Sequence, residues 1–124
     1  MQTEKDHMIQ IFGVKSSQAA RAADRFFKER RIAIQFVDLK LKPMAPGEIR
    51  RFVEKFGLAK LIDTEGKAYD SAGLKYLRAS DTSLLEKIER EPQLLRLPLV
   101  RCGKILSIGQ NEAAWKEMAA QPNP

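Results

Sequence analysis

The stretch MIQIFGVKSSQ, residues 8–18, decides the fold. Its apolar, β-prone run stops at Gly13, and a helical pattern begins after Ser16 and Ser17, which predicts a strand, a loop and a helix with a hydroxyl residue at the helix N-cap. Such a junction directs several backbone N–H groups and the positive end of a helix dipole at one place. Proteins use that place to bind an anion or to hold a thiolate of low pKa. This loop has no cysteine, so its role is the main functional question.

A βαβ unit is predicted around this loop. A buried strand over 8–12 precedes a helix over 18–30, and a second, β-branched strand follows over 32–39. The two strands should be parallel and joined by a right-handed crossover. Apolar residues at the spacing of one helix face should bury the helix, namely Ala19, Ala22, Ala23, Phe26 and Phe27.

Helices are predicted for the middle of the chain. One should span 46–56, with Pro46 near its first turn and Gly57 as its stop. Its buried face should consist of Ile49, Phe52, Val53 and Phe56. Another helix should begin at Ser80 and end before Pro92, with Leu84, Leu85 and Ile88 directed inward. Residues 58–77 between them are the least regular part, with a turn signal at 63–66.

The last third predicts a β-hairpin and a final helix. Two apolar runs within 97–108 are separated by Arg-Cys-Gly-Lys, where Gly103 should supply a positive φ. A helix should follow over 111–120. The element order is thioredoxin-like, and a proline before the hairpin strand is where that fold keeps a cis peptide bond, so Leu97–Pro98 is predicted to be cis.

These elements predict an α/β protein. We expect a thioredoxin-like (glutaredoxin-like) mixed sheet of about four strands, with helices on both faces and a helical insertion in the middle. Residues 8–120 should form a single domain, residues 1–7 a flexible leader and residues 121–124 a disordered tail.

Charge and cysteine content narrow the classes of function. The net charge is +6 and the pI near 9.6, but the Lys and Arg residues are mixed with acids and have no stacking aromatics among them, so direct nucleic-acid binding is not expected. No apolar run is long enough to cross a membrane. Cys102 is the only cysteine, which rules out an internal disulfide and agrees with a cytoplasmic location. With His7 as the only histidine, no metal site is expected.

Seven short segments resemble the arsenate reductase (ArsC)/Spx family over about residues 8–119. They are Phe12-Gly13-Val14-x-x-Ser17, 21–31, Asp38, 61–69, 80–92, 94–100 and Gly103-Lys104. The resemblance implies a thioredoxin-like fold. In arsenate reductases of this family a cysteine in the first loop attacks the oxyanion, and arginines hold the charge of the anion.

The resemblance also implies that this machinery is missing. The family cysteine falls on Ser17, and the arginines fall on Asp63, on Leu97 and near Ile108 or Gly109. The C-x-x-C of Spx regulators is absent too. A serine hydroxyl stays protonated at neutral pH without a positioned base and cannot perform sulfur redox chemistry, so arsenate reductase activity is not expected.

Other residues could still form a ligand site. Lys15, Ser16 and Ser17 could bind a small anion or glutathione at the helix N-terminus, or Ser17 could simply cap the helix. Arg96, one position from the family arginine, could reach the pocket mouth or lie in solvent. Pro98 should shape the pocket and could hold an extended peptide.

Cys102 is the only thiol. It should lie in an exposed hairpin turn between Arg101 and Lys104, whose charges would lower its pKa. It is either an incidental surface cysteine or a redox-responsive, glutathione-accepting thiol.

We therefore expect a binding or regulatory module that has lost the family chemistry. The Spx resemblance implies a protein partner, the α subunit of RNA polymerase. The alternative is an ArsC-like oxidoreductase or glutathione-dependent thiol enzyme that uses Cys102 or the Ser17 pocket. No cofactor is required, although glutathione fits the alternative.

Overall fold

The computed structural model describes residues 8–71, 73 and 80–120. The chain divides into two compact units, the first from Met1–Asp38 and Leu97–Pro124, the second from Leu39–Arg96. The predicted leader (1–7) and tail (121–124) lie outside the described residues, as does part of the irregular segment at 58–77.

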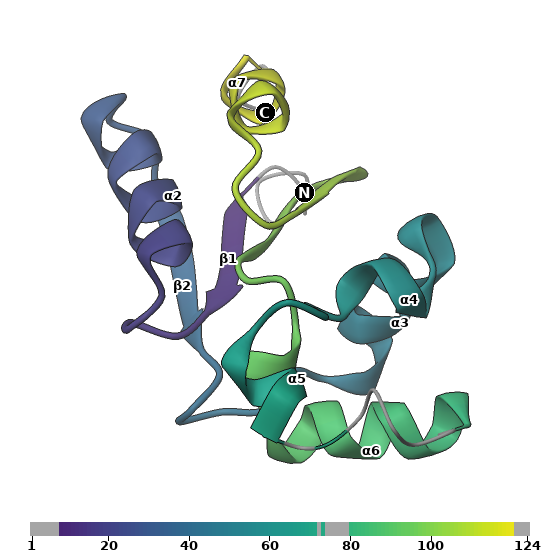
Figure 1. Cartoon of the computed structure of the whole chain (residues 1–124). Helices are drawn as coiled ribbons and strands as arrows, with labels where there is room; N and C mark the ends of the chain where they lie inside the picture. The colour runs from purple at the N-terminus through teal and green to yellow at the C-terminus, as the bar shows by residue number, and fades with distance from the viewer. Residues whose placement is uncertain (1–7, 72, 74–79, 121–124) are drawn as a thin grey trace. The chain divides into compact units, whose positions relative to one another are not determined.

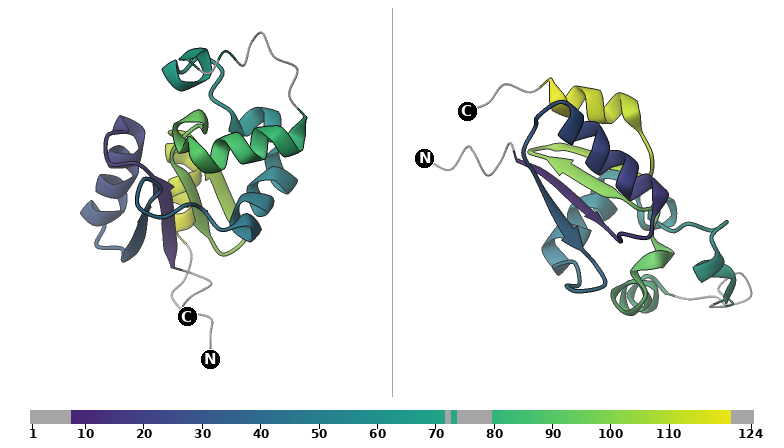
Figure 2. Two further views of the ribbon diagram at one scale, coloured as in Figure 1. Left: turned by 90° about the horizontal axis from the view of Figure 1, so that it is seen from below. Right: turned by 90° about the vertical axis from the view of Figure 1, so that its left-hand side faces the viewer.

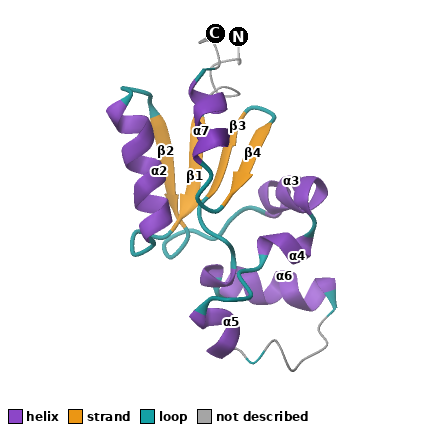
Figure 3. Ribbon diagram, turned by 45° about the horizontal axis from the view of Figure 1, so that its top comes forward, coloured by secondary structure: helices purple, strands orange, loops and turns teal. Residues whose placement is uncertain are grey.

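The first unit is built on a mixed four-stranded sheet, as predicted (Figures 1 and 3). Its strands are β1 (Ile9–Gly13), β2 (Ile34–Asp38), β3 (Leu99–Cys102) and β4 (Ile105–Ile108). The order across the sheet is β2-β1-β3-β4. β1 runs parallel to β2, with Ile11 opposite Phe36, and the other two pairs are antiparallel.

Two helices, α2 (Gln18–Glu29) and α7 (Glu112–Ala119), pack on one face of this sheet (Figure 3). Aromatic side chains fill the space between them, since the Phe26 and Trp115 rings lie 5.6 Å apart and Phe27 is fully buried. The predicted helix face is nearly right, but Ala20 is buried in place of Ala19. α2 ends in a Schellman arrangement, in which Ile32 N–H donates to the Phe27 carbonyl and Arg31 takes a positive φ of 58°.

The hairpin has a shorter loop than the sequence predicted. Only Gly103 and Lys104 form the turn, and Gly103 has a φ of 60°, as a two-residue hairpin loop requires. Arg101 and Cys102 belong to β3 instead. The cis Leu97–Pro98 bond is confirmed.

The second unit consists of short helices (Figure 2). They are α3 (Pro46–Phe56), α4 (Leu58–Leu61), α5 (Lys67–Ser71), α6 (Asp81–Arg90) and the 3-10 helix η2 (Pro92–Leu94). α3 has the predicted bounds, and Gly57 ends it with a φ of 85°. Ser80 caps α6 by accepting a hydrogen bond from Ser83 N–H at 3.2 Å. α4 and α5 could not be located from the sequence, because four or five residues are too few to show helical periodicity.

Backbone pairing closes the second unit. Ile62 forms an antiparallel bridge with Leu95. Beside it, Asp63 N–H donates to the Leu94 carbonyl and Arg96 N–H to the Leu61 carbonyl, each at 2.7 Å. The residues after α4 are thereby tied to the residues after η2. Within the described ranges, no helix has the length and apolar character needed to span a membrane.

Candidate functional site

Ser17 caps α2, as the sequence predicted. Its backbone is extended, its N–H donates to the Val14 carbonyl at 3.0 Å, and its Oγ accepts a hydrogen bond from Ala20 N–H at 3.2 Å. The side chain is half-buried, whereas Lys15 and Ser16 are exposed. The hydroxyl oxygen is therefore already used by the helix that it begins.

Pro98 lies against the start of this loop. A Cβ at Gly13 would lie 3.7 Å from Pro98 Cβ and only 3.0 Å from Ala20 Cβ. The contact with Ala20, tighter than side chains normally allow, explains why β1 ends in a glycine. Pro98 is fully buried, and its carbonyl accepts from Gly109 N–H at 3.0 Å. The structure thus brings Pro98 to the Ser17 loop as a packing residue.

Arg96 is engaged within the second unit. Its Nε donates to the Lys60 carbonyl at 3.0 Å, and its guanidinium lies 3.8 Å from the Asp63 carboxylate in a half-exposed ion pair. The same Asp63 oxygen accepts from Glu65 N–H at 3.3 Å. Asp63, the position where the resemblance places an arginine, is therefore charge-compensated by a neighbour. A contribution of Arg96 to a pocket at Ser17 stays a prediction.

Cys102 is not the exposed turn residue that the sequence analysis expected. It is 2% exposed and belongs to the core formed by β1, β3, α2 and α7. Because the hairpin loop has two residues, Cys102 pairs with Ile105 inside the ladder and faces inward, two positions from Val100.

Burial also reverses the expected electrostatics of this thiol. Desolvation raises the pKa of Cys102 above its ordinary value, and the charge of Arg101 lowers it by less. The side chain of Arg101 donates instead to Gln10 Oε1. At neutral pH the thiol is protonated and shielded, which makes it a poor nucleophile.

Among the residues that the structure describes, no three His, Cys, Asp or Glu side chains gather closely enough to hold an ion.

An open groove that the sequence did not predict lies between α3 and α6 and has a volume of about 420 Å³. Apolar side chains form most of it, namely Met44, Pro46, Ile49, Val53 and Leu85, and the remaining lining residues are Arg50, Thr82, Glu86 and Glu89. Ile49, Val53 and Leu85 were expected to be core residues. Val53 and Leu85 are only half-buried. The sequence indicates two amphipathic helices, but it does not indicate that a groove remains between them.

Comparison with known proteins identifies the relatives. The model of the ArsC family matches residues 12–118. The chain belongs to the ArsC family. It is 26% identical over 107 residues to the global transcriptional regulator Spx of Streptococcus agalactiae, a match that covers 85% of this chain and 78% of the relative. The Spx regulator of Lactiplantibacillus plantarum is 25% identical, covering 85% and 81%.

A solved arsenate reductase from Vibrio cholerae superposes on the chain with a TM-score of 0.75 at 18% identity, covering 90% of this chain and 97% of that one. This likeness establishes the thioredoxin-like fold of the ArsC family. The resemblance seen in the sequence is confirmed, and so is the fold class.

Proposed function

We propose that this ArsC-family chain is a binding or regulatory module that has lost the thiol chemistry of the arsenate reductases. The observation that carries the proposal is the state of its two candidate nucleophiles. The Ser17 hydroxyl oxygen caps α2, and the Cys102 thiol is buried in the core with a raised pKa. Neither group is a solvent-accessible thiolate.

The charges of the second unit support the same proposal. Clamping an oxyanion requires cations that are free to meet it. Here Asp63 adds a carboxylate at a position where the resemblance implies an arginine, and Arg96 lies 3.8 Å from that carboxylate. Part of the positive charge of Arg96 is therefore compensated by the Asp63 carboxylate.

A regulatory role is supported by the relatives. Those that match at 25–26% identity are named global transcriptional regulators. We propose that this chain likewise acts through a protein partner in the cytoplasm, with the α subunit of RNA polymerase as the first partner to test on the Spx resemblance.

The second candidate is a glutathione-dependent thiol enzyme. The observation in its favour is the helix N-terminus at Ser17, where Lys15 and Ser16 are exposed and could bind an anionic group. The burial of Cys102 counts against it. A pocket at Ser17 would therefore bind glutathione without reacting with it.

Arsenate reduction coupled to glutathione oxidation tests the proposal, measured with the unaltered chain and with Cys102→Ala. We expect neither protein to reduce arsenate above the uncatalysed rate. Reduction that disappears in Cys102→Ala would overturn the proposal in favour of the enzyme.

A titration of the unaltered chain with glutathione, phosphate and arsenate, followed by NMR at the amides of residues 14–20, tests the Ser17 loop separately. Saturable shifts there would establish a ligand site. Their absence at millimolar ligand would leave Ser17 as a helix cap only.

A further inference from the structure

The α3–α6 groove has the form of a docking surface. Its walls are two helices of the second unit, seen beside each other in the left view of Figure 2. Its volume of about 420 Å³ is in the range of ligand sites. The half-buried Val53 and Leu85 leave apolar surface open to solvent between the helices. Concave, mostly apolar surfaces between helices are places where proteins bind ligands and partner helices.

A second hollow of about 430 Å³ also has Glu89 in its lining, beside Leu39, Lys40, Pro43 and the segment 90–93. Residues of α6 therefore line both hollows.

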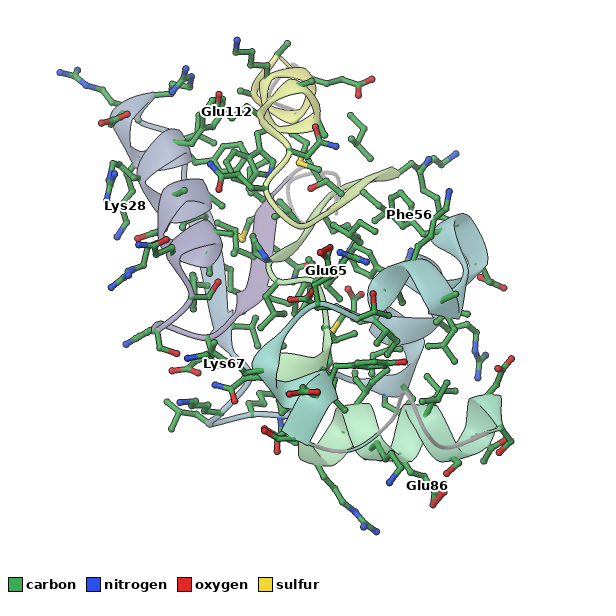
Figure 4. The ribbon with its side chains drawn as sticks, in the orientation of Figure 1. Lys28, Phe56, Glu65, Lys67, Glu86 and Glu112 are labelled. Atoms are coloured by element: carbon green, nitrogen blue, oxygen red, sulfur yellow. The ribbon has the colours of Figure 1, made fainter. Side chains whose placement is uncertain are left out.

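The two edges of the groove differ in charge. Glu86 and Glu89 stand three residues apart on α6 and are both exposed, and Glu86 projects away from that helix in Figure 4. Arg50 is exposed on α3 across the groove. Within the described part of the chain, these three side chains are not held in ion pairs with one another or with a neighbour. The α6 edge is therefore an acidic strip on a protein whose net charge is +6.

We propose that this groove receives an amphipathic helix from a partner protein, whose apolar stripe is bordered by Lys or Arg residues that face Glu86 and Glu89. A helix laid in an apolar groove between helices is a recurring mode of recognition, with anchors at positions i, i+3, i+4 and i+7. The acidic edge favours a partner helix with basic residues on its flanks. Arg50 repels those basic residues from α3, so they should face α6. The inference rests on the proposed binding function and names the chemistry of the partner.

Two synthetic helical peptides of about 18 residues, or five turns, test the proposal. Both carry the same leucine stripe; one has Lys on both flanks and the other has Glu. Their affinities for the whole chain are measured by fluorescence anisotropy, and the binding surface is mapped by NMR. The net charge of +6 favours the Glu peptide at any non-specific site. A preference for the Lys peptide therefore reports the acidic strip.

We expect the Lys peptide to bind about fivefold more tightly, as two half-exposed ion pairs would provide. Glu86→Lys combined with Glu89→Lys should reverse that order. The matched control, Glu54→Lys with Glu65→Lys, changes the charge equally at exposed positions outside the groove lining and should keep it. Leu85→Gln should weaken both peptides about tenfold, and circular dichroism verifies that each variant is folded.

Other outcomes overturn the inference. These are binding of neither peptide at millimolar concentration, an order that the Glu86/Glu89 variant does not change, or NMR shifts away from α3 and α6. Sedimentation that shows a dimer lost in Leu85→Gln would assign the groove to a second copy of the chain instead. The failure of the proposed function would appear separately, as arsenate reduction by a chain whose groove still binds the Lys peptide.

Discussion

A thiol enzyme needs a cysteine at an accessible, activating position. In this chain the Ser17 loop provides such a position, whereas the cysteine lies at the C-terminal end of β3, at Cys102. The loop has the backbone for reactivity, with a helix N-terminus and a half-exposed side chain, but it presents a hydroxyl. β3 has the thiol, but Cys102 is 2% exposed and lies among Phe27, Val100 and Trp115. The cysteine and the backbone environment that would activate a cysteine are therefore at different places in this chain. Chemistry at a cysteine depends on both, because only an accessible thiolate attacks a substrate.

Moving the thiol from the core to the loop is the change with the largest expected effect. In Ser17→Cys combined with Cys102→Ala, the thiol lies at the N-terminus of α2, which lowers its pKa, and it is half-exposed. We expect iodoacetamide to alkylate this variant at least about a hundredfold faster than the unaltered protein, in which Cys102 reacts only when the core opens. The rate is measured by mass spectrometry near neutral pH.

Cys102→Ala alone is the control and should not react. Equal rates in the double variant and the unaltered protein would mean that Cys102 is accessible, and the contrast between the two regions would be lost.

The contrast also explains which parts of the structure the sequence could predict. The Ser17 cap, the end of α3 at Gly57 and the turn at Gly103 each depend on a local backbone requirement that one residue type meets. The burial of Cys102 does not. It depends on whether the hairpin loop has two residues or four, because only the shorter loop keeps Cys102 in β3, two positions from Val100 and on the same inward face.

The groove was missed for a related reason. The helical periodicity of Ile49, Val53 and Leu85 correctly indicated which side of each helix is apolar. It could not show how completely α3 and α6 cover those sides, because that depends on side chains far apart in the chain. The cap residue at a helix terminus was thus predictable, and the residues that line the space between two helices were not.

Making the core position polar should have the second largest effect. In Cys102→Ser a hydroxyl replaces the buried thiol, and a hydroxyl costs more free energy than a thiol to transfer from water into an apolar core. We expect the free energy of unfolding to fall by about 1–3 kcal/mol. Chemical denaturation with urea measures it. Cys102→Ala separates loss of volume from burial of a polar group, and a serine variant as stable as the unaltered protein would contradict the assigned environment.

Removing the cap at the loop should have a smaller effect. Ser17→Ala deletes the oxygen that accepts from Ala20 N–H, and we expect a loss of about 1 kcal/mol in the free energy of unfolding. Ser17→Asn restores an acceptor at this position and should recover most of the loss. Urea denaturation of the three proteins compares them. If Ser17→Asn were as unstable as Ser17→Ala, the hydroxyl would have a role beyond capping.

The smallest predicted effect is a pH dependence that belongs to Cys102 alone. A thiol in the unfolded chain ionises at a pKa of about 8.5, and burial raises the pKa of Cys102 in the folded protein. Between these values the folded state keeps a proton that the unfolded state has released, so stability must fall as pH rises. The free energy of unfolding of the unaltered protein minus that of Cys102→Ala should therefore be constant below about pH 8 and decline above it. Lysine and tyrosine titrations are common to both proteins and cancel in the difference. A difference that rises with pH would place Cys102 beside a dominant positive charge. A flat difference would mean that folding leaves the pKa of Cys102 unchanged, as expected for a thiol exposed to water.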